Sequence, residues 1–554
     1  MDFNCKDELS SDEYVELIFR EGILSRNNLE RIENFCVIPI NSKWSLVSVP
    51  ISSISSATYE IIGYSAFPGI YGLSDLGAVN SAGISAVREQ PVIGLYGTGT
   101  CIAIIDTGIN WRHKAFINAN NTTRIKILWD QESNTVFSEE QINRALAGEN
   151  INIPGDDNGH GTFIAGIAAG NIDRENGFSG VAPFANLIVV RLRQAKKYLR
   201  DFYSIKDNIP AYAETDIMRA VAFVSNYAEK RGLIVSYCIS VGTSLGSHSG
   251  TSPLCDLLAD EAEKTGRCIS VASGNEGIER LHFEGRVEDE AVPVRVEIHI
   301  GNNEEGVSCE LWSDAPEIYT IEIISPTGQI INRVPQRIES TTRLRFIFED
   351  TTLFLYYKRY ESRSGKNLAV LRFKNPSAGI WTLNVYGSNL IVGRFNIWMI
   401  NREFLTNDTY FLEPSPQTTL VEPANTMECI TVSAYDYVNQ SLYIKNGRGY
   451  TASNIIKPDF CAPGVNISGP SAFVVNGYEI RSGTSVAAAF YSGIAALIQE
   501  YGIVRQNIPY LNTNDIRNIT ISGCIRQDGI VYPSALWGYG IVNLYNSIEN
   551  MRDE

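Results

Sequence analysis

The chain of 554 residues has a composition that narrows its class before any motif is considered. Hydrophobic residues make up 44% and charged residues 19%, as in globular proteins, and the length predicts about three to four structural units. The 46 basic and 62 acidic residues give a net charge of −16, which argues against nucleic acid or anionic lipid as a partner, because both require a cationic surface. No stretch approaches about 18 unbroken apolar residues, so we expect no membrane span.

The N-terminal residues are predicted to form a small α+β unit. Residues 1–8 lack the basic and apolar regions of a signal peptide, so we expect cytoplasmic synthesis. Residues 11–20 have a helical pattern, whereas residues 36–40 and 44–49 are predicted to be short strands. Residues 64–80 are rich in Gly, Ser, Ala and Pro and are predicted to be a loop or linker.

Residues ~95 to 280 alternate between apolar strands and helices, which predicts a parallel sheet covered on both faces. The expected strands are residues 101–105, 186–192, 233–239 and 268–272, and the expected helices are 162–169 and 215–227, the latter capped by Thr215. Residues ~281 to 420 contain at least seven alternating runs, typical of a β-sandwich or jelly roll. Because the α/β pattern then returns, the all-β block is predicted to be an insertion into one α/β domain.

The ten cysteines form no CxxC pair, and several lie in apolar runs. Free cysteine behaves in such runs as a small core residue. We therefore predict no disulfide framework and no zinc site, and no other metal site is assigned.

Three segments carry candidate chemistry. Asp106 follows a buried strand, at the sheet edge where sites form, although a strand-ending turn has the same pattern. His160 is the histidine that stands between two glycines at a predicted helix start, where a substrate can approach closely. Ser485 begins an Ala-rich helix whose N–H groups can help hold an oxyanion, although a plain helix cap is the simpler reading.

Taken together, the order Asp106, His160, Ser485 is one of the known chain orders of the Ser-His-Asp triad, and the chain resembles the subtilisin-like serine proteases, the subtilases. Residues 180–183, 273–277 and 457–464 also match landmarks of that family. The resemblance implies a doubly wound parallel sheet and a serine endopeptidase acting on protein or peptide substrates, without a cofactor.

The resemblance also implies residue roles. Ser485 would be the nucleophile, His160 the general base and Asp106 the group that orients the histidine, while the side chain of Asn275 would bind the oxyanion. Ser240, Val241 and Gly242 would pair with the substrate backbone. A rival register, residues 244–246, matches in letters but lies past the predicted strand end.

Residues 124–131, 246–250 and 537–540 look like the Csp-type subtilases of spore-forming clostridia. That likeness implies four segments: a prodomain (1–75), the first part of the catalytic domain (76–280), an inserted jelly roll (281–420) and the second catalytic part (421–554). It further implies that the prodomain is cut off between residues 70 and 82 and stays bound non-covalently. A role in activating a zymogen during germination, with a spore-associated location, would follow from the same likeness.

Two other readings of the whole chain stay open at this stage. A catalytically silent subtilase fold could act as a signalling or binding protein, although such relatives lose triad residues that this chain keeps. An esterase fused to a carbohydrate-binding module is disfavoured, because the serine lies in Gly-Thr-Ser and not in a Gly-x-Ser-x-Gly elbow.

Three further features near the predicted site have ordinary explanations. We expect His113 to be structural. His248 is a candidate for lining the cleft. The pair Asp156 and Asp157 is a weak calcium candidate, and a solvated loop is the simpler interpretation.

Overall fold

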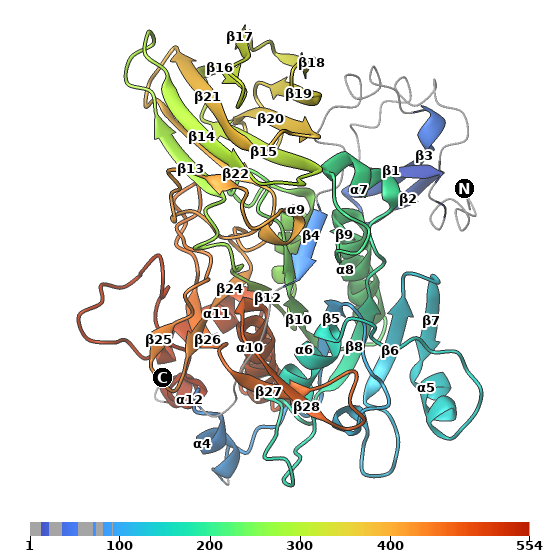
Figure 1. Cartoon of the computed structure of the whole chain (residues 1–554). Coiled ribbons are helices and arrows are strands. Elements are labelled where there is room, and N and C mark those ends of the chain that lie inside the picture. The colour runs from blue at the N-terminus through green and yellow to red at the C-terminus, as the bar shows by residue number, and fades with distance from the viewer. Residues whose placement is uncertain are drawn as a thin grey trace.

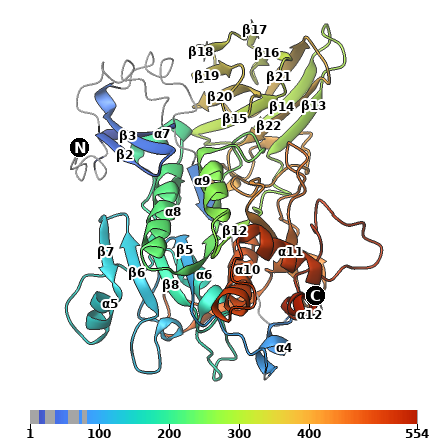
Figure 2. The same cartoon turned by 180° about the vertical axis from the view of Figure 1, so that it is seen from behind.

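The structure is a computed structural model that describes residues 11, 13–20, 36–53, 70–73, 81–90 and 92–552. Figures 1 and 2 show a central α/β part, a block of strands packed at one end of it, and a small N-terminal sheet beside helix α7 (Lys197–Tyr203). The predicted linker lies outside the described residues except for residues 70–73.

The α/β part is built on a nine-stranded sheet. Its parallel strands, in spatial order, are β26 (Phe460–Pro463), β24 (Ile430–Asp436), β12 (Arg267–Ala272), β10 (Ile234–Ile239), β5 (Thr100–Asp106), β8 (Asn186–Arg191) and β6 (Ile125–Asp130). The short strands β25 (Ser441–Leu442) and β7 (Thr135–Ser138) add antiparallel pairings to β24 and β6. The predicted parallel α/β sheet is confirmed.

Helices cover both faces of this sheet, which explains why its strands are apolar along their whole length. In β5, Ile102 and Ile104 belong to the core shared with α6 (His160–Ala169) and α10 (Thr484–Gln499). The alternate residues Ala103 and Ile105 belong to the core shared with α8 (Glu214–Glu229) and α9 (Pro253–Ala262). The remaining helices are α4 (Ile84–Glu89), α5 (Glu139–Leu146), α11 (Thr513–Gly523) and α12 (Leu544–Arg552).

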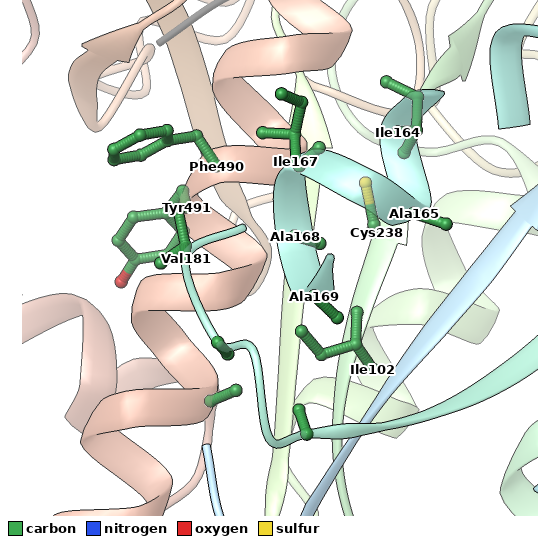
Figure 3. Packing of buried hydrophobic residues seen from close by; sticks show 14 of the residues in the cluster. Ile102, Ile164, Ala165, Ile167, Ala168, Ala169, Val181, Cys238, Phe490 and Tyr491 are labelled. Atoms are coloured by element: carbon green, nitrogen blue, oxygen red, sulfur yellow. The ribbon is translucent and has the colours of Figure 1, made fainter. Parts of the chain in front are cut away.

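Small side chains let α6 and α10 approach each other closely. Figure 3 shows Ile167 and Ala168 of α6 beside Phe490 and Tyr491 of α10. A Cβ added to Gly493 of α10 would lie 2.8 Å from the Ala168 carbonyl oxygen of α6, so a larger residue there would force the helix outward. This packing fixes the start of α10 relative to the start of α6.

Among the described residues, one continuous helical stretch, Thr484–Val504, is long and apolar enough to cross a membrane. This stretch begins with α10, the core helix just described, and 89% of its most apolar window is buried inside the protein.

An all-β block lies between His282 and Phe411. One sheet has the order β13 (His282–Arg286), β22 (Arg394–Met399), β15 (Gly306–Ser313), β20 (Asn367–Lys374), β19 (Thr351–Lys358) and β18 (Glu339–Phe346). The other has the order β17 (Ile330–Val334), β16 (Ile318–Ile324), β21 (Gly379–Ser388), β14 (Val294–Ile300) and β23 (Tyr410–Phe411). All pairings are antiparallel and the two sheets share one hydrophobic core.

The block leaves and rejoins the α/β part at neighbouring points, because β12 before it pairs in parallel with β24 after it. Its outer face packs on the loop that contains Gly246 and His248. There Glu310 accepts a hydrogen bond from the Gly246 backbone N–H at 2.9 Å, and Trp398 stacks on His248. The finer prediction of a jelly-roll topology stays a prediction.

The N-terminal sheet corrects one predicted element. Residues predicted as a helix form strand β1 (Tyr14–Arg20), which pairs with β3 (Trp44–Pro50), and β3 pairs with β2 (Cys36–Pro39), both antiparallel. The helix prediction was wrong because alternate residues of β1 face different surroundings: Val15 and Leu17 pack against α7, whereas Glu16 meets buried cations.

Two smaller expectations also fail. Cys36 is disulfide-bonded, whereas the eight other described cysteines are free, so the prediction of no disulfide is wrong at this position. Helix α8 is preceded by Ala213 without a side-chain cap. Thr215 lies inside the helix instead, and its hydroxyl donates to Glu16 at 3.2 Å.

Candidate active site

Asp106 is the last residue of the buried strand β5, and its side chain is fully buried. It accepts hydrogen bonds from His160 Nδ1 at 2.8 Å, from the Thr107 backbone at 2.7 Å and from the Ser240 hydroxyl. Burial alone would raise the pKa of this carboxyl, but the attraction of His160 and these hydrogen bonds outweigh burial and hold the pKa below its ordinary value. The carboxylate is therefore ionised and able to orient the imidazole.

His160 is the first residue of α6, and the glycines around it allow its position. Gly159 has φ of 87°, which favours glycine. A Cβ on Gly161 would lie 2.2 Å from the Gly108 carbonyl oxygen, so only glycine lets this helix start so close to the end of β5. With Nδ1 donating to Asp106, Nε2 faces the Ser485 hydroxyl oxygen at 3.3 Å.

Ser485 is the second residue of α10, so its backbone N–H lies at a helix N-terminus, where anions are favoured. Asn275 follows β12 and reaches the same point. Its Oδ1 accepts hydrogen bonds from the Thr484 backbone and hydroxyl, both at 3.2 Å. With Oδ1 so engaged, the Asn275 amide Nδ2 is the group left to face the cleft beside Ser485.

Asp156 was misjudged from the sequence, because its carboxylate is buried and braces the site. It accepts from the Thr107 hydroxyl at 2.8 Å and from the backbone and hydroxyl of Thr162 at 2.8 and 2.7 Å. It thereby ties the residue after Asp106 to the first turn of the helix that carries His160. Asp157, in contrast, is exposed and pairs with Arg191 at 2.8 Å.

The predicted substrate strand is occupied by the chain itself. Val241 and Gly242 form β11, which pairs antiparallel with β4 (Ile70–Leu73). The other edge of β4 pairs with β9 (Tyr212–Ala213), and Figure 1 shows β4 beside β9. Ser240 itself is buried against Asp106, so the strand begins next to Asp106 and His160. In the rival register, the backbone N–H groups of Ser244 and Gly246 bond to Asn401 and Glu310 instead.

A cleft of about 450 Å³ opens beside these groups. Its lining includes His160, Gly242, Gly274, Asn275 and Val421, together with Glu276, Glu279, Asn401, Arg402 and Lys445. Burial and the neighbouring Glu279 raise the pKa of Glu276 to about 7. The all-β block contributes to the rim: Asn401, just after β22, donates to the Gly242 carbonyl at 3.0 Å.

The other histidines near the site do not join it. His113 is buried and accepts from the Ala115 backbone at 3.1 Å, in line with a structural role. His248 does not line the cleft; it is buried, with ring centroids 4.0 Å from Trp398. Within the part of the chain that the structure describes, no cluster of three His, Cys, Asp or Glu residues is arranged to hold a metal.

The family profile of the subtilases (Peptidase S8) matches residues 97–308 and 405–540, more than half of the chain. The chain therefore belongs to the subtilase family, and it is a subtilisin-like serine protease. The interval between the two matched segments, residues 309–404, lies within the all-β block.

Individual relatives agree with this assignment. The structure of the Clostridium perfringens CspB protease superposes with a TM-score of 0.77 and 30% identity, covering 85% of this chain and 97% of that one. This confirms the predicted likeness to Csp-type proteases. The major intracellular serine protease of Bacillus subtilis (strain 168) is 24% identical over 257 residues, which is 46% of this chain and 67% of that protein. Bacillopeptidase F of the same organism is 28% identical over 156 residues, 27% of this chain, and the match spans 10% of that protein.

Sequence reasoning missed three parts of the site. Asp156 carried a signal in its position shortly before the helix of His160, because Asp is favoured near helix N-termini. Strand β9 and Val421 carried none, because only the tertiary structure brings residues 212 and 421 to the substrate strand.

Proposed function

We propose that this chain is a serine endopeptidase that cleaves its own N-terminal segment through an acyl-enzyme on Ser485. The single observation that carries the self-processing is the pairing of β4 between β9 and β11, the position that a substrate backbone would take. On this proposal the N-terminal segment is a prodomain and the first substrate.

The chemistry follows from the side chains described above. His160 Nε2 takes the proton of the Ser485 hydroxyl as Oγ bonds to the scissile carbonyl carbon. The developing oxyanion is met by the Ser485 backbone N–H and the Asn275 side chain. His160 then gives the proton to the leaving amine as the C–N bond breaks. Water, activated by the same imidazole, releases the acyl group from Ser485.

The register of β4 directs the cut to a specific bond. Leu73 lies opposite Val241, and Gly72 lies opposite Gly242. Ser74, the next residue in the sequence, lies outside the described residues. On the other strand, Ser240 precedes Val241 and bonds to Asp106. We therefore propose cleavage after Ser74, inside the interval of residues 70–82 expected from the sequence.

Retention of the cleaved segment is supported by a buried contact of β1. Glu16, 1% exposed, pairs with Arg193 at 2.7 Å and with Lys196 at 3.2 Å. The attraction of these cations overcomes the opposing effect of burial and lowers the pKa of Glu16 to about 2. Such a contact does not depend on the continuity of the chain at residue 74.

The physiological substrate is proposed by analogy. Because the chain is similar to the CspB protease over most of its length, we propose that it activates a protein zymogen in germination, with cytoplasmic synthesis and a spore-associated location. The competing reading, a silent binding protein, would require the described triad geometry to be inactive.

Intact mass measurement of the wild-type protein beside Ser485→Ala tests the proposal. We expect two fragments from the wild type, the smaller ending at residue 74, and one uncut chain from the variant. A Ser492→Ala protein, altered at another buried serine of α10 that bonds to the Ala489 carbonyl, is the matched control and should be cut. An uncut wild type that a fluorophosphonate probe also fails to label would contradict the proposal and favour the silent protein.

A further inference from the structure

One valine narrows the part of the cleft between Gly242 and Gly274. We propose that Val421 is a specificity-determining residue that restricts the substrate residue before the scissile bond to small side chains. This inference rests on the proposed action of Ser485 and adds the class of substrate residue that the site accepts.

The walls of this pocket follow from the positions of the reacting groups. The scissile carbonyl must lie between Ser485 and Asn275, while the substrate backbone runs along Ser240–Gly242. The side chain of that substrate residue must then enter the gap between β11 and the segment that follows β12. Gly242 and Gly274 line the two sides of this gap and contribute no side chain.

Val421 fills the gap between these two glycines. A Cβ on Gly242 would lie 2.4 Å from one methyl of Val421, and a Cβ on Gly274 would lie 2.6 Å from the other. The valine therefore touches both walls, and it is 4% exposed at the floor of the cleft.

The valine is also held in place from both sides. Its backbone N–H donates to the Ser273 carbonyl at 3.2 Å, on one wall. The next residue, Glu422, exchanges two backbone hydrogen bonds with Thr243 on the other wall, at 2.8 and 2.9 Å. A β-branched side chain has few rotamers, so Val421 has little freedom to move aside for a large substrate side chain.

The consequence is a site for Gly, Ala or Ser. An aromatic or long side chain would have to displace Val421 or its neighbours, and such overpacking disfavours binding. The residue that follows β4 in the chain, Ser74, is of the accepted size.

The test compares two tetrapeptide 4-nitroanilides, succinyl-Ala-Ala-Pro-Ala and succinyl-Ala-Ala-Pro-Phe, on the full-length processed protein. We expect kcat/KM to favour alanine by about tenfold or more in the wild type. In Val421→Ala the preference should fall by about tenfold or reverse. The control Val224→Ala removes the same atoms from the core under α8 and should lower the melting temperature without altering the preference.

A second readout does not depend on catalysis. Fluorescently labelled forms of the two peptides are titrated into Ser485→Ala, with and without Val421→Ala, and the ratio of their affinities is compared by polarisation. Both peptides must displace β4 from β9 and β11, and this common cost cancels in the ratio. If phenylalanine is accepted as well as alanine in the wild type, or if Val421→Ala changes the ratio no more than Val224→Ala, the inference is overturned. Failure of the proposed function gives a different result. The nitroanilides would then stay uncleaved and the fluorophosphonate probe would not label the protein, while the ratio of the two peptide affinities would still report on the pocket.

Discussion

The N-terminal strands β1 and β4 meet the α/β part by different kinds of contact. Strand β1 brings a buried carboxylate, Glu16, to two cations and to the Thr215 hydroxyl. Strand β4 is joined to β9 and β11 by strand pairing, which depends on main-chain hydrogen bonds rather than on particular side chains. On the proposed function, the difference separates two tasks: a contact by charge suits a segment that stays bound, and a contact by backbone suits one that is cut like any other substrate.

The largest expected effect comes from Asn275→Ala, which should slow cleavage of the N-terminal segment and leave its retention unchanged. Losing one oxyanion donor is expected to cost about 2.7–4 kcal/mol of transition-state stabilisation, or roughly 10²–10³ in rate. The time course of fragment appearance on a denaturing gel measures it. A variant that is cut at the wild-type rate would remove Asn275 from the mechanism.

Glu16→Gln should act in the opposite way, with cleavage kept and retention lost. The substitution leaves the buried Arg193 and Lys196 without the Glu16 charge, and breaking a buried pair costs about 3–5 kcal/mol. We expect the lower end, about 3 kcal/mol, because Asp216 still faces Arg193 at 3.0 Å. Size-exclusion chromatography of the cleaved protein reports co-elution of the two fragments.

Glu13→Gln is the matched control for this variant, since Glu13 is exposed and directly precedes strand β1. Co-elution that survives Glu16→Gln as well as it survives Glu13→Gln would mean that the buried charge does not hold the segment.

Acid should loosen the β1 contact before it affects strand pairing. The pKa of Glu16 is lowered from 4.5 to about 2, so the folded state gains stability from the ionised group above pH 4.5. That contribution is lost as the pH falls from 4.5 towards 2. Fragment co-elution measured from pH 6 to pH 3 should decline in the wild type. The Glu16→Gln protein should give a flatter profile over this range, and parallel profiles would contradict the assignment.

The smallest effect is expected from Gly72→Pro, which removes the backbone N–H of the β4 residue that lies opposite Gly242. A lost hydrogen bond is worth about 0.5–1.5 kcal/mol, so cleavage should slow by up to about tenfold while the fragments still co-elute. Gly72→Ala keeps the N–H and serves as the control. Equal rates for the two variants would argue that β4 pairing does not position the scissile bond.

Much of the α/β part could be predicted because its signals are local. A run of apolar residues in β5, two glycines around His160 and a serine opening an Ala-rich helix each reflect constraints within a few residues. The N-terminal strand β1 could not be predicted in this way. Its residues have a pattern compatible with a helix, and pairing with β3, about thirty residues further on, decided the outcome.

Asp156 shows the same limit within the site. The sequence presents two adjacent carboxylates before a helix, which is typical of a solvated loop. In the structure one is buried under hydrogen bonds from Thr107 and Thr162, and its neighbour is exposed. Which carboxylate turns inward depends on the end of β5, about fifty residues earlier in the chain.

The sequence by itself therefore determined the kinds of groups available for catalysis, their order and the strand–helix alternation that carries them, because each depends on neighbouring residues. The tertiary structure alone decided that β4 lies between β9 and β11, that Asp156 joins Thr107 to Thr162 and that Val421 stands between Gly242 and Gly274. These features depend on contacts between residues far apart in the chain, and such contacts form only when the sheets and helices have packed.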